Sequence, residues 1–258
     1  INLMVAELAK DLLEQSGARI LLTRDHNAPV TDIRPEDLMP VAEQEMARRG
    51  PNPSEASIRS LANLLFYRVA ELQARATALE DQKIHLALSI HFNALPEFSG
   101  TQRLSDEPEH LHFLVNGSYL PSELALDNVR FELVQRLVQR YDRVEIPVAE
   151  RFARVFSERT ELPAFSYSGP NARPVGDSGY VWARNLLANR IFPCPVIYLE
   201  PYAMNGRRTY HRLAAGDFEG TRMIEGRQEV SIFQEYAEMI RDSLVAYFYG
   251  LLEYDSRR

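Results

Sequence analysis

Cysteine is nearly absent from this chain of 258 residues, in which Cys194 is the single example. One cysteine cannot form an internal disulfide, and it excludes a zinc site built from cysteine thiolates. The single cysteine does not decide between a location inside the cell and export, because an exported protein need not contain disulfides. Cys194 stands between two prolines at the start of an apolar stretch, and we expect it to be a small buried apolar side chain.

Long apolar runs and blocks of positive charge are also missing. No segment approaches the roughly 20 apolar residues that a transmembrane helix needs, and no run of basic residues is longer than a pair. With 29 Lys and Arg against 36 Asp and Glu, the net charge is −7, which argues against a nucleic-acid-binding surface. The chain begins at Ile1 without an initiator Met or a signal peptide, so we expect it to have been cut upstream and any export signal to have been lost.

What remains is the composition of a globular domain, with 45% hydrophobic and 25% charged residues. Helical periodicity predicts a helix that starts at Ile1 and is closed by Gly17, and further helices over residues 58–80, 122–141, 148–159 and 231–254. Short apolar strands are expected over residues 18–23, 84–90, 110–115 and 195–200. This alternation predicts a single α/β domain with a mostly parallel, twisted sheet that helices cover on both faces.

Two stretches interrupt this pattern. Five prolines punctuate residues 29–60, around a short helical piece at 41–49, and we interpret this segment as an insertion that is either a lid or a solvated surface loop. Residues 163–179 are rich in Pro, Gly, Ser and Asn and are expected to be a loop over the functional face.

Two of the predicted strands end in side chains that can do chemistry. The strand at 84–90 delivers His91, and the strand at 195–200 ends in Glu200. If these strands are parallel neighbours, both groups meet at the edge of the sheet where ligands and metals collect in α/β proteins. A neutral imidazole is a natural zinc ligand, and a carboxylate beside a metal-bound water is a natural general base. The alternatives without function are that His91 is a hydrogen-bonded histidine of the core and that Glu200 is an exposed charge at a strand end.

At these residues the chain resembles a known family, the zinc-dependent N-acetylmuramoyl-L-alanine amidases of type 3. The most specific match is Ser-Ile-His-Phe-Asn-Ala at 89–94, which is similar to the family's zinc-binding strand. Residues 17–25 resemble its Leu-Thr-Arg-Asp strand, and Leu72 and Arg75 lie at the expected distance before the zinc strand. Residues 195–200 resemble the strand that ends in the catalytic Glu, and Asn205 is similar to an Asn that follows it.

The resemblance implies a Zn²⁺ site in which His91 is a metal ligand, Glu200 is the general base, and Asn93 supports the ligand from outside the coordination shell. The family's two other zinc ligands, a His and a Glu, would lie upstream of Ile1. We therefore interpret residues 1–258 as an amidase-like catalytic domain that is incomplete at its N-terminus, with insertions at 29–60 and 161–183 that elaborate the walls of a groove.

Other histidines are weaker candidates for a metal ligand. His85 and His91 share a face of one strand but are about 20 Å apart, which is too far for one metal. His110 and His112 are better spaced, but they precede a strand core and do not follow one. His26 follows residues 17–25 and is expected near the correct edge, whereas His211 lies among arginines and is expected at the surface.

The function implied by the resemblance is hydrolysis of the amide bond between N-acetylmuramic acid and the L-alanine of the stem peptide in peptidoglycan. A binding protein that keeps the fold and has lost its metal is one alternative, and a zinc peptidase acting within the stem peptide is another. A cell-wall substrate implies a periplasmic or extracellular location. The acidic charge gives no attraction to an anionic wall, so an activator or a wall-targeting protein is a partner to consider.

Overall fold

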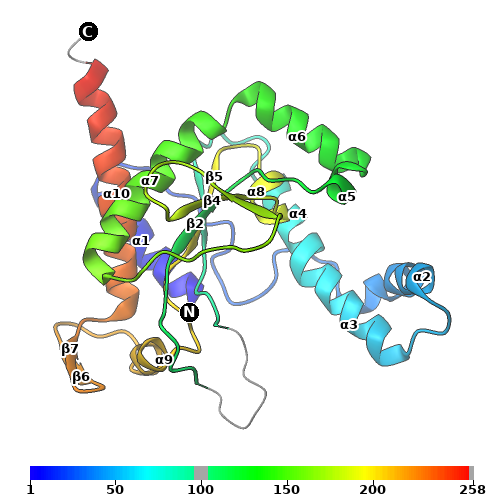
Figure 1. Cartoon of the computed structure of the whole chain (residues 1–258), viewed down its shortest axis with the longest axis horizontal. Coiled ribbons are helices and arrows are strands. Elements are labelled where there is room, and N and C mark those ends of the chain that lie inside the picture. Colours follow the sequence, from blue (N-terminus) through cyan, green and yellow to red (C-terminus); the bar gives the residue numbers. More distant parts are fainter. Residues whose placement is uncertain (96–103, 256–258) are drawn as a thin grey trace.

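The computed structural model of the chain describes residues 1–95 and 104–255. A five-stranded sheet lies at its centre (Figure 1), in the spatial order β1-β5-β2-β4-β3. The strands are β1 (Ala87–Ile90), β2 (His112–Val115), β3 (Ala172–Pro174), β4 (Val181–Arg184) and β5 (Val196–Glu200). The β1–β5 and β2–β4 pairs are parallel, whereas the β2–β5 and β3–β4 pairs are antiparallel. The α/β class predicted from the sequence is confirmed, and the sheet is mixed in direction.

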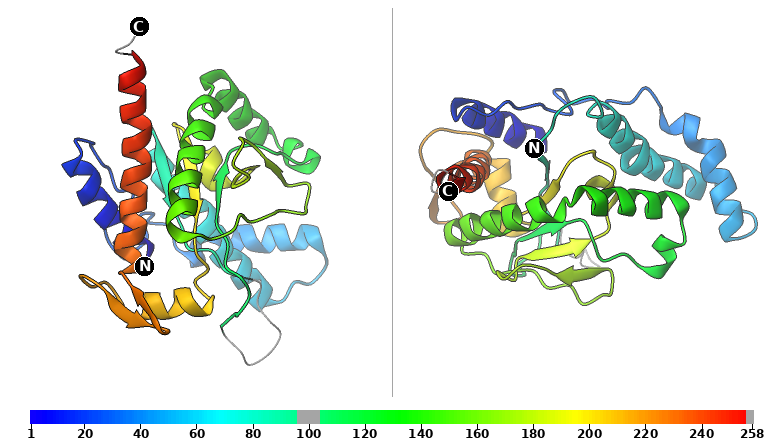
Figure 2. Two further views of the ribbon diagram at one scale, coloured as in Figure 1. Left: turned by 60° about the vertical axis from the view of Figure 1, so that its left-hand side comes forward. Right: turned by 90° about the horizontal axis from the view of Figure 1, so that it is seen from above.

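One face of the sheet is apolar and packs against three helices, α1 (Asn2–Gln15), α7 (Asp142–Thr160) and α10 (Ile232–Asp255). Alternate strand residues such as Phe113 and Leu199 point to this face, because successive side chains of a strand lie on opposite sides. Figure 2 shows α10 between α1 and α7, and α10 packs against both. Burial of the apolar stripes of these helices against the sheet forms the main core.

The opposite face carries a smaller cluster of buried side chains, Leu114, Ala172 and Trp182, with Tyr167 and Tyr198 packed against it. Because side chains two apart in a strand share a face, the same face also receives His112 and Glu200. This face therefore combines aromatic and titratable groups, and it is where the functional candidates lie.

Residues 35–77 form a series of helices that extends away from the sheet, as the blue and cyan ribbons of Figure 1 show. They are η1 (Pro35–Leu38), α2 (Met39–Arg49), α3 (Glu55–Leu65), a π-helical turn η2 (Phe66–Ala70) and α4 (Glu71–Thr77). The predicted helix at 58–80 is confirmed and begins earlier, where the Ser54 hydroxyl caps it by accepting the Ser57 N–H at 3.2 Å. Whether residues 29–60 are an insertion stays a prediction.

The strand predicted over residues 18–23 is wrong. The segment is not part of any ladder in the described chain, although Ile20 packs against the main core. A strand exists only through hydrogen bonds to a neighbour, and none of the described strands pairs with this segment. Packing of Ile20 therefore holds the segment against the core, while Leu21 is exposed.

The helix predicted over residues 122–141 is broken in two. A single turn, α5 (Pro121–Leu124), is followed by α6 (Asp127–Gln139), and neither helix is capped by Ser122, whose position would suit a cap. Glu123 closes the first turn by accepting the Leu120 N–H at 2.7 Å, and the chain changes direction before α6 starts. Val129 of α6 is buried, while Leu126 and Leu137, at helical spacing from it, are exposed.

The predicted first and last helices are confirmed as α1 and α10, and the helix predicted at 148–159 extends over α7 with Pro147 inside it. Elements absent from the predictions include the strands β3 and β4 of the central sheet, the helices α8 (Leu187–Arg190) and α9 (Arg207–Ala214), and a hairpin of β6 (Arg222–Ile224) and β7 (Arg227–Glu229). Among the described residues, none of the helices combines the length and the apolar character that crossing a bilayer requires.

Candidate functional site

Two predicted site residues meet at one edge of the sheet. The parallel ladder of β1 and β5 places Ile90 opposite Leu199, so the next residues, His91 and Glu200, leave the ladder side by side. Both side chains are on the face that carries the aromatic cluster, since they continue the alternation of Ser89 and Tyr198. The predicted convergence of two strand ends is therefore observed, while the role of each residue stays a prediction.

A third titratable group joins them from the other direction. Strand β2 runs antiparallel to β5, and His112, its first residue, is the register partner of Glu200. The Nε2 atom of His112 lies 2.7 Å from Oε2 of Glu200, with 1% and 18% of these side chains exposed. The sequence makes His112 a weak candidate because it precedes its strand. That reasoning holds only for strands that run parallel to β5.

The loop between α7 and β3 closes over His112. The Tyr167 hydroxyl lies 2.9 Å from Nε2 of His112, and Arg184 donates to this hydroxyl at 3.4 Å. Phe165 packs against the His112 ring, and its carbonyl accepts the indole N–H of Trp182 at 3.1 Å. The loop predicted over residues 163–179 thus lies over the functional face, although part of it forms β3.

The surroundings of His91 favour a neutral ring. The imidazole stacks on Tyr198, with ring centroids 4.3 Å apart, and its backbone carbonyl accepts the Tyr236 hydroxyl at 3.1 Å. Burial holds the pKa of His91 below its ordinary value; the charge of Glu200 opposes this shift and that of Arg75 adds to it. A neutral imidazole keeps a lone pair that can bind a metal or accept a proton.

The environment of Glu200 favours its ionised form. Burial alone would raise the pKa of this carboxyl group, but the hydrogen bond from His112 and the positive charge of Arg184 act in the opposite direction, and the pKa is lowered. At neutral pH the group is therefore a carboxylate, which is the form that a general base needs.

Asn93 and Asn205 hold the chain just beyond β1. The Asn93 side chain accepts the N–H of Ala94 at 2.7 Å, and the structure gives no hydrogen bond from Asn93 to His91. Asn205 both donates to and accepts from the backbone of Leu95, at 2.9 and 2.8 Å. Both asparagines therefore fix the backbone that follows His91, and support of His91 by Asn93 stays a prediction.

The residues of the described chain do not complete a metal site. Among them, no three His, Cys, Asp or Glu side chains are grouped closely enough to hold a metal ion. His112 is an imperfect donor, since its Nε2 faces Glu200 and its buried Nδ1 has no hydrogen-bond partner in the described residues. Zinc binding with His91 as a ligand is thus an expectation from the resemblance alone, and no step of the chemistry is assigned to a metal here.

His110 packs edge-on against Phe165 beside His112, with ring centroids 4.4 Å apart, whereas the other three histidines and the cysteine lie elsewhere. His26 is exposed and pairs with Asp25 at 2.5 Å, His211 is half-exposed and pairs with Glu225 at 3.3 Å, and His85 is exposed. Cys194 is buried, and burial raises the pKa of its thiol to about 11. Cys194 is therefore the inert apolar side chain that we expected.

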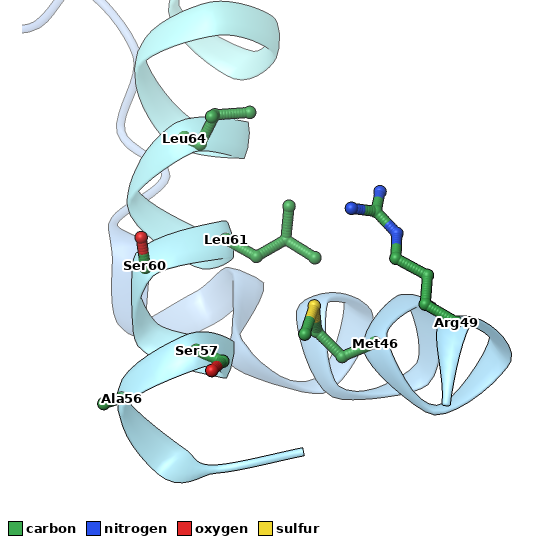
Figure 3. A pocket seen from close by; sticks show the side chains of 7 residues that line it. All are labelled: Met46, Arg49, Ala56, Ser57, Ser60, Leu61 and Leu64. Carbon is green, nitrogen blue, oxygen red and sulfur yellow. The ribbon is translucent and has the colours of Figure 1, made fainter. Parts of the chain in front are cut away.

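Two hollows are lined by other residues. One, of about 470 Å³, lies between α2 and α3, with Met46 and Leu61 facing each other across it (Figure 3). The other, of about 530 Å³, is lined by charged side chains from the loop before β2 and from α9, among them Glu109 and Arg207. Neither is lined by His91, His112 or Glu200, so the candidate site is defined by its side chains and their contacts.

Comparison with solved structures identifies the fold. The chain is similar to the CwlD amidase of Clostridioides difficile, solved in complex with the GerS lipoprotein, with a TM-score of 0.50 and 12% identity over 96% of this chain and 84% of that one. It also aligns with the N-acetylmuramyl-L-alanine amidase Ami1 of Mycobacterium smegmatis, with a TM-score of 0.40 and 15% identity over 70% of this chain and 62% of that one. No family model and no curated protein matches the sequence. The structural similarity to type 3 amidases that the motifs imply is confirmed, at low sequence identity.

Proposed function

We propose that the chain is an N-acetylmuramoyl-L-alanine amidase, which hydrolyses the amide bond between N-acetylmuramic acid and the L-alanine of the peptidoglycan stem peptide. The observation that carries this proposal is the pairing of His91 and Glu200 at the ends of the parallel strands β1 and β5. The amidase-like fold supports it.

In this proposal Glu200 is the general base. Its lowered pKa keeps it ionised, so it can take the proton of the attacking water and pass a proton to the leaving amine. His91 is the zinc ligand, because burial keeps its ring neutral. Zinc, when bound, would polarise the water and the scissile carbonyl.

The site of action would be the cell wall, in the periplasm or outside the cell. CwlD was solved in complex with a lipoprotein, GerS, and we propose that a targeting or activating protein also directs this chain to its substrate. The net charge of −7 supports such a partner, because an acidic protein is not drawn to an anionic wall by charge alone.

One observation favours a second function, peptidoglycan binding without catalysis. A binding protein would need no metal, and the described residues do not group three metal-ligating side chains. Against it stands Glu200, whose partly buried carboxylate is held by His112. Burial of a charge is costly, and carboxylates with a perturbed pKa are enriched at functional sites.

The test is a digestion of dye-labelled sacculi followed by mass analysis of the released products. New amino groups on L-alanine identify an amidase, cut stem peptides identify a peptidase, and binding without release identifies a binding protein. Glu200→Ala should reduce release to a small residual rate in a protein that still folds, and Glu158→Ala, which removes an exposed carboxylate of α7, should not. Undiminished turnover by Glu200→Ala would rule out Glu200 as the base.

A further inference from the structure

We propose that His112 is a positioning residue for Glu200, acting through a single hydrogen bond from its Nε2 atom. This inference rests on the proposed function, in which Glu200 is the base. It concerns a residue outside the set that the amidase resemblance assigns, and it is carried by the contacts around the His112 ring.

The position of the proton on His112 follows from its two nitrogens. Nε2 lies 2.7 Å from the Glu200 carboxylate, whereas Nδ1 is buried and has no partner among the described residues. A proton on Nδ1 alone would turn the lone pair of Nε2 toward a carboxylate oxygen, which is repulsive. Protonation of both nitrogens would bury an unpaired N–H, which is costly. The neutral ring with its proton on Nε2 avoids both the repulsion and the unpaired N–H, and it leaves only the lone pair of Nδ1 without a partner among the described residues.

Tyr167 and Arg184 keep the ring in this orientation. The Tyr167 hydroxyl lies 2.9 Å from the same Nε2 atom and can share its proton, while Arg184 donates to that hydroxyl and lies over the Tyr167 ring at 5.3 Å. Phe165 packs beside His112, at 4.9 Å between ring centroids. The imidazole therefore cannot turn away from Glu200 without losing contacts on two sides.

This arrangement fixes one oxygen of the base and leaves the other available. His112 lies beside Oε2, and Oε1 of Glu200 has no hydrogen-bond partner within the described part of the chain. A carboxylate held by one oxygen cannot rotate freely, so the free oxygen points in a defined direction. Precise orientation of a reacting group lowers the barrier, and small misplacements cost up to about 100-fold in rate.

The experiment compares three replacements of His112. The amide nitrogen of glutamine reaches about as far as Nε2, that of asparagine only about as far as Nδ1, and leucine offers no donor. We expect His112→Gln to retain most of the wild-type kcat and His112→Asn and His112→Leu to lower it by roughly 10- to 100-fold, with KM unchanged. Asparagine and glutamine are both polar, so their comparison stands even if the leucine variant does not fold. Equal kcat values for the Gln and Asn variants would overturn the proposal.

A double variant separates positioning from general structural damage. If His112 acts through Glu200, then His112→Asn should not lower the residual rate of Glu200→Ala any further. A further loss in that background would show that His112 acts by another route. Activity of Glu200→Ala equal to wild type would instead disprove the base itself, which is the failure of the proposed function.

A readout that needs no activity completes the test. Nitrogen–proton correlation spectra of isotope-labelled protein distinguish the two ring nitrogens of a histidine. We expect a protected proton on Nε2 of His112, assigned by its loss in His112→Gln and shifted by Glu200→Gln. A proton on Nδ1, or no response to the Glu200 substitution, would overturn the proposal even if the protein showed no turnover.

Discussion

Glu200 and His112 are register partners across the antiparallel β5–β2 ladder, and their side chains approach to 2.7 Å. The pair joins the carboxyl end of one strand to the amino end of the next. His91 arrives beside it from β1, which runs parallel to β5. Three strands therefore supply one cluster, and the mixed direction of the sheet is what brings them together.

Removal of metal tests the role of His91 directly. We expect purified protein to lose activity with a chelator and to regain it with zinc, and His91→Ala to weaken zinc binding by at least about 100-fold. His26→Ala is the matched control, because His26 is exposed and lies outside the cluster. Elemental analysis and turnover measured side by side give the answer. Wild-type zinc content in His91→Ala would contradict the assignment.

Glu71 predicts a pH-dependent part of the stability. Its carboxylate accepts the N–H groups of Val30 and Thr31, at 2.9 and 3.3 Å, and pairs with Arg75, so it fastens α4 to the loop after residue 25. Burial would raise its pKa, but these hydrogen bonds outweigh burial and hold the pKa below the ordinary value. Glu71→Gln should lower the free energy of unfolding at neutral pH by about 1–3 kcal/mol.

The sign of the pH dependence follows from the lowered pKa of Glu71. The stabilisation is complete above the unfolded pKa of about 4.3 and is lost as pH falls through the lower folded value. Urea unfolding of wild type and Glu71→Gln should therefore converge in acid. Glu55→Gln, in an exposed i,i+4 pair with Arg59, should differ little from wild type at any pH. A constant gap for Glu71→Gln across the titration would refute the linkage.

The sequence located His91 and Glu200 because their signal is local. An apolar strand that ends in a functional side chain can be recognised without knowledge of its neighbours, and both strands are observed. Parallel pairing of β1 and β5 then brings the two ends to the same edge. Parallel pairing of these two strands is therefore the only long-range relation on which the meeting of His91 and Glu200 depends.

His112 and Tyr167 were out of reach for a different reason. The place of His112 depends on the direction of β2 relative to β5, and no residue near it encodes that direction. Tyr167 reaches the site from a loop, through a contact between positions 55 residues apart. The missing strand at 18–23 is a similar case, because a β-like pattern does not reveal whether a partner strand exists.

A buried ion pair joins α6 to α7. Arg136 donates to Glu145, which also accepts the N–H of Val196 at 2.7 Å, and both charged side chains are almost completely buried. Burial raises the pKa of Glu145, and the Arg136 charge and the hydrogen bonds oppose that shift. Arg136→Met leaves the carboxylate unpaired and should cost about 3–5 kcal/mol in unfolding free energy.

The double variant Arg136→Met/Glu145→Met decides whether the pair as such stabilises the fold. We expect it to recover much of the loss, because replacing both charges by apolar groups removes the cost of burying them. Thermal unfolding of the two single variants and the double variant measures the coupling. A double variant less stable than either single variant would show that the pair is a net contributor.

Asn205 links the two chain segments that leave the candidate site. Its side chain makes both hydrogen bonds to the backbone of Leu95, so it ties the loop after β5 to the chain that follows His91. Asn205→Ala removes the hydrogen-bond partner of both the N–H and the carbonyl of the buried residue Leu95. It should lower the free energy of unfolding by about 1–3 kcal/mol.

If the same link also holds His91 in place, turnover should fall by roughly 10-fold at unchanged KM, since a small displacement of a reacting group is enough to slow the reaction. Asn63→Ala on the exposed side of α3 is the control and should change neither quantity. A stable Asn205→Ala protein with unaltered turnover would show that the Leu95 backbone is held by its other contacts.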